Sequence, residues 1–208
     1  MRKIEKPNEF GNLVSFKRND DIFIMEDMTN TIINSYYINA FQGDEKIITK
    51  FIKHVESKFR SSDQYSAYLG YLKSEYNLKK CAILGNIDDD NATIELHHYP
   101  LYLYEICEIL LIDSFKKQEQ INSFILINKL LNLHYKNLVG LVPLSKTIHE
   151  LVHSSNENGI IIPIESVFGN TNEFIKLYKE SIPDITISKY NERLKLSNTE
   201  TDYGLLKK

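Results

Sequence analysis

The stretch LVGLVPLSKTIHELVHSS, residues 138–155, joins an apolar run to a helical pattern and decides the expected fold. Its first part, residues 138–145, predicts a strand that stops at Pro143. The remainder predicts a helix that carries His149 and His153. Histidines four residues apart share one helix face, with Cβ atoms about 6 Å apart. This pair can therefore hold one metal ion.

A second pair of histidines lies upstream, in ATIELHHYP, residues 92–100. Ile94 and Leu96 alternate with polar residues, which predicts another strand, ending at the final proline. Adjacent side chains of a regular strand point to opposite faces. His97 and His98 can therefore serve one site only if the strand ends or bulges at this point.

Helical patterns surround these two strands. Apolar residues recur at three- and four-residue spacing over 44–60, 63–76, 103–111, 121–131 and 172–181. KKCAILGNI, residues 79–87, predicts a further buried strand, and residues 12–26 predict a hairpin. The expected fold class is α+β. We expect an N-terminal annex over residues 1–56, a core domain over residues 57–182, and a C-terminal helix and tail over residues 183–208.

Composition excludes several classes of protein. The chain has 208 residues, of which 42% are hydrophobic, so it can bury a core. Its net charge of −3 and its four arginines argue against a protein that coats nucleic acid. Two cysteines exclude a disulfide framework and a four-cysteine zinc site. No apolar run reaches the roughly 18 residues of a membrane span, so we expect a cytoplasmic protein without a membrane partner.

The order of strand-end histidine pair, second strand and HxxxH helix resembles the HNH endonuclease superfamily, the ββα-metal nucleases. KCAILGNI, IELHHYPLYLYEI and VGLVPLSKTIHELVHSS resemble phage-encoded HNH-type proteins with a helical insertion between the strands. The resemblance covers about residues 58–182. It implies a ββα-metal core with flanking helices, and metal-dependent hydrolysis of phosphodiester bonds, those of DNA in the first place. The expected location is then the bacterial host cytoplasm.

The resemblance also implies residue roles. His97, His149 and His153 would bind the metal, and His98 would be the general base that accepts a proton from the attacking water. Three imidazoles suit Zn²⁺, Ni²⁺, Co²⁺ or Mn²⁺ better than Mg²⁺, which prefers oxygen ligands. The expected cofactor is one such divalent ion.

The asparagine that positions the loop in this family has no direct match. Spacing from the helix would place it at Gly140, which has no side chain. Asn137 is the nearest candidate for this catalytic role, and Asn132 is an alternative. The insertion of about 36 residues between the strands also departs from the minimal motif.

Two other functions compete with the nuclease. HELVH matches the HExxH signature of zinc proteases, with Glu150 as general base and Glu173 as a third ligand, although this leaves the histidine pair at 97–98 unexplained. The other alternative is a non-catalytic phage protein, regulatory, structural or partner-binding, that retains a metal-stabilised ββα fold. For this chain, a homodimer or a complex with another phage protein is a further expectation.

Overall fold

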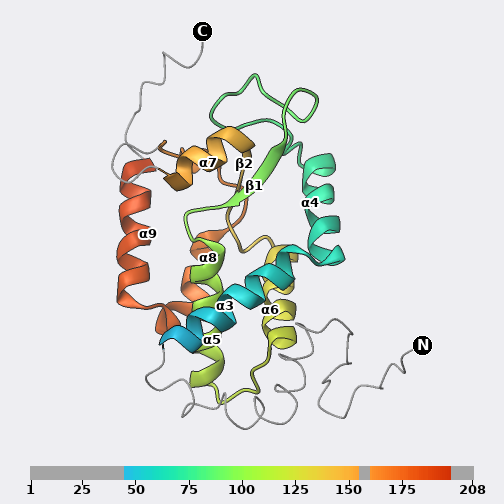
Figure 1. Cartoon of the computed structure of the whole chain (residues 1–208). Helices are drawn as coiled ribbons and strands as arrows, with labels where there is room; N and C mark the ends of the chain where they lie inside the picture. The colour runs from blue at the N-terminus through green and yellow to red at the C-terminus, as the bar shows by residue number, and fades with distance from the viewer. Residues whose placement is uncertain (1–44, 155–159, 198–208) are drawn as a thin grey trace, which may run out of the picture.

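The computed structural model describes residues 45–154 and 160–197, which form a mostly helical fold with one small sheet (Figure 1). The elements, in chain order, are α3 (Glu45–Arg60), α4 (Asp63–Glu75), β1 (Ile94–His98), α5 (Leu103–Lys116), α6 (Ser123–Tyr135), β2 (Leu141–Ser145), α7 (Lys146–Ser154), η2 (Ile164–Ser166), α8 (Thr171–Tyr178), η3 (Lys179–Ser181) and α9 (Asp184–Ser197). The predicted α+β class is confirmed. This arrangement is not in itself specific to HNH nucleases.

The sheet consists of β1 and β2, which pair in antiparallel fashion with His97 opposite Val142. α5 and α6 connect the strands, and α7 begins directly after β2. Pro143 lies inside β2 and does not end it, so that prediction is wrong. A proline has no N–H to give to a ladder, and β2 tolerates it because it has only one partner strand among the described residues. The Pro143 carbonyl accepts a hydrogen bond from the Ala82 N–H, at 2.8 Å.

The main core lies between α3, α5 and α6. The apolar face of α3 supplies four buried side chains to it, namely Phe51, Ile52, Val55 and Phe59. Burial of such a side chain contributes about 1.5–3 kcal/mol. α3 continues across residues 56 and 57, where the sequence predicts a boundary between annex and core. The remainder of the annex, including the hairpin expected at 12–26, lies outside the described residues.

The strand predicted over residues 79–87 is wrong. Only an isolated bridge joins Lys80 to Asp88, and the chain between them turns at Gly85, whose φ is +61°. Cys81 and Ile83 are nevertheless buried, in a second cluster that packs on the sheet. The apolar alternation therefore reflects burial. The backbone of this segment folds back on itself through the Lys80–Asp88 bridge and a turn in which the Gly85 N–H donates to the Cys81 carbonyl, and it forms no continuous ladder.

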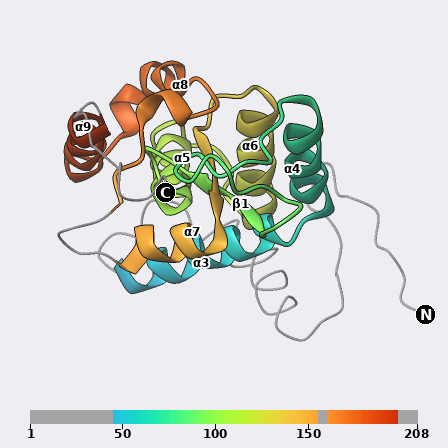
Figure 2. The ribbon, with the colours of Figure 1, turned by 90° about the horizontal axis from the view of Figure 1, so that it is seen from above.

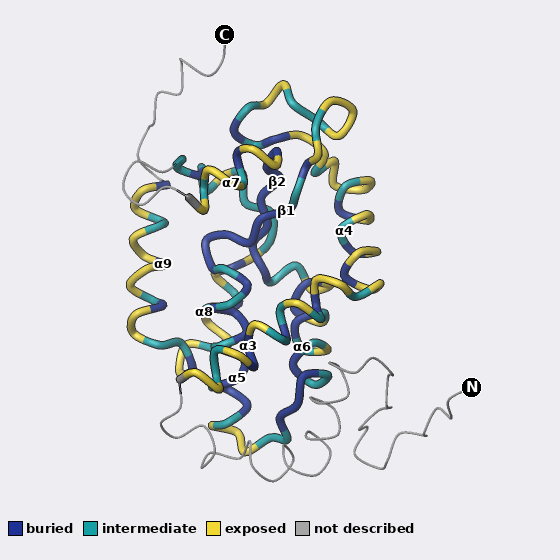
Figure 3. Tube along the Cα trace, in the orientation of Figure 1, coloured by how far each residue is buried: buried dark blue, intermediate teal, exposed yellow. Residues whose placement is uncertain are grey.

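α9 is tied to the segment that links β1 to α5. The Arg193 guanidinium donates to both carboxylate oxygens of Glu105, at 2.6 and 2.9 Å, and to the carbonyl of Pro100, at 2.7 Å. The hydroxyls of Tyr99 and Ser197 lie 2.6 Å apart. Figure 2 shows α3 and α7 on one side of the molecule and α8 on the opposite side. Figure 3 shows both strands largely buried, with the outer faces of α4 and α9 exposed.

Candidate metal centre

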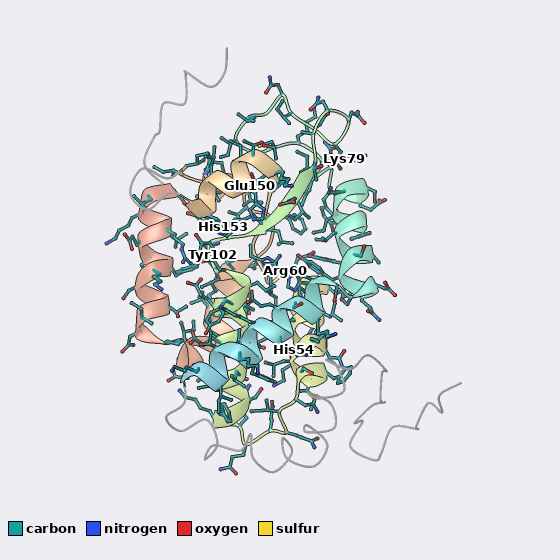
Figure 4. All side chains as sticks on the ribbon, viewed as in Figure 1. His54, Arg60, Lys79, Tyr102, Glu150 and His153 are labelled. Atoms are coloured by element: carbon teal, nitrogen blue, oxygen red, sulfur yellow. The ribbon has the colours of Figure 1, made fainter. Side chains whose placement is uncertain are left out.

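Three of the predicted ligands lie together where α7 crosses the sheet. His97 projects from β1, and His149 and His153 project from one face of α7. The ring centroids of His97 lie 4.8 Å from His149 and 5.0 Å from His153, and the two helix rings are 4.8 Å apart. One nitrogen of each ring lies within 4.8 Å of the others. Figure 4 labels His153 beside Tyr102, on the face that also carries Arg60.

The hydrogen bonds fix which nitrogens face the centre. His149 donates its Nδ1–H to the carboxylate of Glu95, so in the neutral ring Nε2 carries the lone pair and accepts the hydrogen bond that joins it to Nε2 of His153. That Nε2 lies 3.1 Å from Nε2 of His153. Nε2 of His97 is buried and has no hydrogen-bond partner among the described residues. The chain therefore offers three Nε2 atoms to a metal ion. A carboxylate orients one of the rings, in the way that carboxylates commonly hydrogen-bond the second ring nitrogen of metal-bound histidines.

Burial favours the neutral, metal-binding form of His97 and of His153. Burial lowers the pKa of His97 to about 3, and the nearby His149 and His153 add to the effect. The pKa of His153 is also lowered, first by burial and then by His149 and Arg60. Proton and metal compete for the same lone pair, so a lowered pKa leaves it available at neutral pH.

The donor set fits a divalent transition metal. Zinc–nitrogen bonds of about 2.0–2.1 Å in a tetrahedral site place ligand nitrogens about 3.3 Å apart. The 3.1 Å between Nε2 of His149 and Nε2 of His153 is close to this value. The ligand nitrogen of His97 lies within 4.8 Å of both. Three imidazoles favour Zn²⁺ and its neighbours over Mg²⁺.

His98 faces away from this centre. Its side chain is 2% exposed, and its Nε2 lies 3.0 Å from Nε2 of His134. His134 donates Nδ1–H to the Leu130 carbonyl, at 2.7 Å, so His98 is the donor between the rings. Burial and then His134 hold the pKa of His98 well below its usual range. β1 includes both histidines and ends at His98, and its pairing with β2 has no bulge at this point, so strand alternation separates the two rings.

Asn137 is also remote from the three imidazoles. It follows α6 with a positive φ of 53°, and its Oδ1 accepts a hydrogen bond from the Tyr68 hydroxyl, at 3.2 Å. The carbonyl of Asn137 accepts from the Asn170 N–H. Its role is to shape the turn before β2. Gly140 has no room for any side chain, since a Cβ there would lie 2.0 Å from the Tyr99 carbonyl oxygen.

The residues of the predicted protease site do not meet. The Glu150 side chain is 68% exposed and lies 4.0 Å from Lys146, one turn earlier. Glu173 is on α8, where it pairs with Lys176. Neither belongs to the histidine group, which is the metal-ligand group found among the described residues.

Sequence patterns did not indicate that Tyr102 and Arg193 flank the centre. Tyr102 has its ring centroid 5.5 Å from that of His97, and the Arg193 guanidinium stacks on Tyr102 at 3.9 Å. Arg193 lies on α9, far from β1 in the sequence, and no residue spacing predicts that it lies close to this strand. Among the flanking residues, only Glu95 could be predicted from the sequence, because the two-residue period of a strand places it on the same face as His97.

Comparisons with known proteins identify the family. A family described as bacteriophage G278-like virion protein matches residues 1–208. Comparisons with curated proteins and with solved structures find no match. No helix among the described residues is both long and apolar enough to cross a membrane.

This match corrects the functional predictions. The HNH resemblance and the endonuclease activity are wrong, and the protease alternative receives no support. The catalytic roles predicted for His98 and Asn137 depended on that resemblance and lose their basis with it. DNA loses its support as a partner together with the nuclease. The resemblance depended on a few histidines around a strand pair and a helix, a pattern that a metal site requires whatever its task. The chain belongs to the bacteriophage G278-like virion protein family.

Proposed function

We propose that this chain is a non-catalytic component of the phage particle whose fold is stabilised by one divalent ion at His97, His149 and His153. The observation that carries the proposal is the convergence of three Nε2 atoms, one of them buried without a partner, beside a carboxylate that orients His149. A buried polar atom without a partner costs about 1–3 kcal/mol, so a ligand for it stabilises the fold.

The ion would join parts of the chain that share little apolar contact. Of the described side chains of α7, Ile148 alone is buried, within the smaller of the two apolar clusters. A metal held from both β1 and α7 would fix the helix across the sheet. Binding to the native state alone contributes about 4 kcal/mol when the free metal is a thousandfold above its dissociation constant.

Membership of a virion family supports phage proteins as the partners of this chain and the phage particle as its location. The composition agrees, since a net charge of −3 with four arginines suits protein contacts better than a nucleic-acid coat. We therefore assign the ion a structural role, in keeping with the non-catalytic phage protein expected as an alternative.

The test is metal binding by the full chain. We expect one equivalent of Zn²⁺ by calorimetry and elemental analysis, and a melting temperature that falls when EDTA removes it. His149→Ala should abolish the tight equivalent and remove the effect of EDTA. His54→Ala is the control, because His54 lies on α3 outside the centre. Failure of wild-type protein to bind Zn²⁺, Co²⁺ or Ni²⁺ would refute the proposal.

A further inference from the structure

The ring of Tyr102 lies against two of the three candidate ligands. Its centroid is 5.5 Å from that of His97, at an interplanar angle of 62°, and 6.1 Å from that of His153. Rings whose centroids lie about 4.5–7 Å apart are in contact, and edge-to-face pairs have a preferred geometry. Tyr102 directly precedes α5 and packs against the smaller apolar cluster. The position of this one ring therefore affects a ligand from β1 and a ligand from α7.

Arg193 of α9 holds the Tyr102 ring in place. Its guanidinium lies over the ring, 3.9 Å from the centroid, in a cation–π contact. Two oxygens of Glu105 and the carbonyl of Pro100 accept its N–H groups, at 2.6, 2.9 and 2.7 Å. The planar guanidinium is thus fixed by its edge as well as by its face. The same Glu105 carboxylate accepts the backbone N–H of Tyr102, at 2.8 Å, so it orients both partners of the stack.

The ion pair that orients this stack is largely removed from water. The side chains of Arg193 and Glu105 are 16% and 9% exposed. A pair of this kind is costly to break, because either partner alone would be a buried and uncompensated charge. A second attachment lies nearby, where the Tyr99 hydroxyl donates to the Arg193 carbonyl, at 3.0 Å. The position of the Tyr102 ring therefore depends on the docking of α9.

Resting on the proposed metal site, we propose that Tyr102 is a positioning residue that couples the docking of α9 to metal binding. Arg193 holds the ring, and the ring restricts the rotation of His97 and His153. Such a coupling is reciprocal, so docked α9 raises the affinity for the ion, and the bound ion makes α9 harder to detach. The ion would thereby control how firmly α9, whose outer face is exposed, is held on the molecule (Figure 3).

The first experiment measures the zinc affinity of the full chain by competition with a chromophoric chelator. We expect Tyr102→Leu, which loses the ring but keeps the backbone bond to Glu105, to bind Zn²⁺ about tenfold more weakly than wild type. Tyr102→Phe keeps the ring and should bind like wild type. Tyr178→Leu is the matched control, because Tyr178 is a half-buried tyrosine of α8 with the Lys117 ammonium 5.9 Å from its ring centroid. α8 lies on the opposite side of the molecule from α7 (Figure 2).

The second experiment tests the connection to α9. Arg193→Lys keeps the positive charge but loses the planar group, so a weaker affinity for zinc would reflect position and not charge. We expect a loss of about tenfold, and the double variant with Tyr102→Leu should bind no more weakly than either single variant. In wild type, saturating zinc should slow hydrogen exchange about tenfold for those α9 amides that exchange by local opening. In Tyr102→Leu saturated with zinc, this slowing should be absent.

The outcomes separate this inference from the metal site itself. Wild-type protein that binds no zinc would remove the metal site and the coupling together. Equal zinc affinities in wild type and Tyr102→Leu, or equal losses in Tyr102→Phe and Tyr102→Leu, would overturn the positioning role of the ring and leave the metal site in place. Additive losses in the double variant would show that Tyr102 acts independently of Arg193. If Tyr102→Leu does not fold, the wild-type exchange decides, and α9 amides that zinc does not slow would contradict the coupling.

Discussion

The carboxylate of Glu95 on β1 accepts a hydrogen bond from Nδ1 of His149 on α7. This bond joins the sheet to the helix that follows it and turns the other nitrogen of His149 towards His153. The orientation of a candidate ligand is thus set by a residue two positions before His97 on the same strand face.

Glu95→Gln should weaken zinc binding about 10–100-fold, because loss of the charged partner makes His149 a poorer ligand. Competition with a chromophoric chelator measures the dissociation constant. Glu150→Gln is the matched control, since it removes a carboxylate of α7 that is 68% exposed and contacts no ligand. Equal affinities in wild type and Glu95→Gln would show that this bond is irrelevant to the metal.

Acid should destabilise the metal-free protein through His134. Burial lowers its pKa to about 4, against a usual value of 6.5, although the Leu130 carbonyl opposes the shift. The unfolded chain therefore binds more protons than the native one between these values, so stability is full above pH 6.5 and falls as pH drops to about 4. The slope attributable to one such group is at most about 1.4 kcal/mol per pH unit.

Urea unfolding of the EDTA-treated protein at pH 4.5, 5.5 and 7.5 measures this slope. His134→Asn keeps a donor near the Leu130 carbonyl but removes the titrating ring, so its profile should be flatter. A wild-type free energy of unfolding that stays constant from pH 7.5 to 4.5 would contradict the assignment.

Gly140→Ala should destabilise the protein by about 2 kcal/mol or more, through overpacking at a fixed backbone. A Cβ at this position would lie 2.0 Å from the Tyr99 carbonyl oxygen and 2.7 Å from Cγ2 of Thr171. Gly70→Ala is the opposite case, because nothing lies within 4 Å of its added Cβ inside α4. It should stabilise by about 0.5–1 kcal/mol. Chemical denaturation of both variants measures these changes in the free energy of unfolding. A Gly140→Ala variant as stable as wild type would contradict the close packing around Gly140.

Arg193→Met should destabilise the protein by about 3 kcal/mol, because it leaves the buried carboxylate of Glu105 without its partner. Hydrogen exchange should then rise first in α9, which this ion pair joins to α5. Lys189→Met removes an exposed charge from the same helix and should change little. The double variant with Glu105→Gln should recover part of the loss. Additive effects of the two substitutions would show that the pair is not coupled.

The sequence predicted the parts of the fold that local periodicity determines. The helices around Phe51 and Leu110 follow the 3.6-residue period, and the two strands follow runs bounded by turn residues. The strand prediction at 79–87 failed because burial and strand pairing leave the same apolar alternation in a sequence, and here the segment makes only an isolated bridge.

The candidate site likewise has residues that the sequence could place and residues that it could not. His149 and His153 could be paired from spacing alone, and His97 joined them because the strands align. His98 could not be placed, because its direction depends on whether regular strand pairing extends as far as that residue.

The order of the ligands along the chain has a consequence for synthesis. His97 leaves the ribosome first, and His149 and His153 follow only after α5, α6 and β2 have emerged. A nascent chain can offer one imidazole and later a flexible pair, but the three meet only when β2 has paired with β1. Tight uptake of the ion would therefore report a completed fold, and phage particles assembled in a zinc-poor host should incorporate this protein less efficiently.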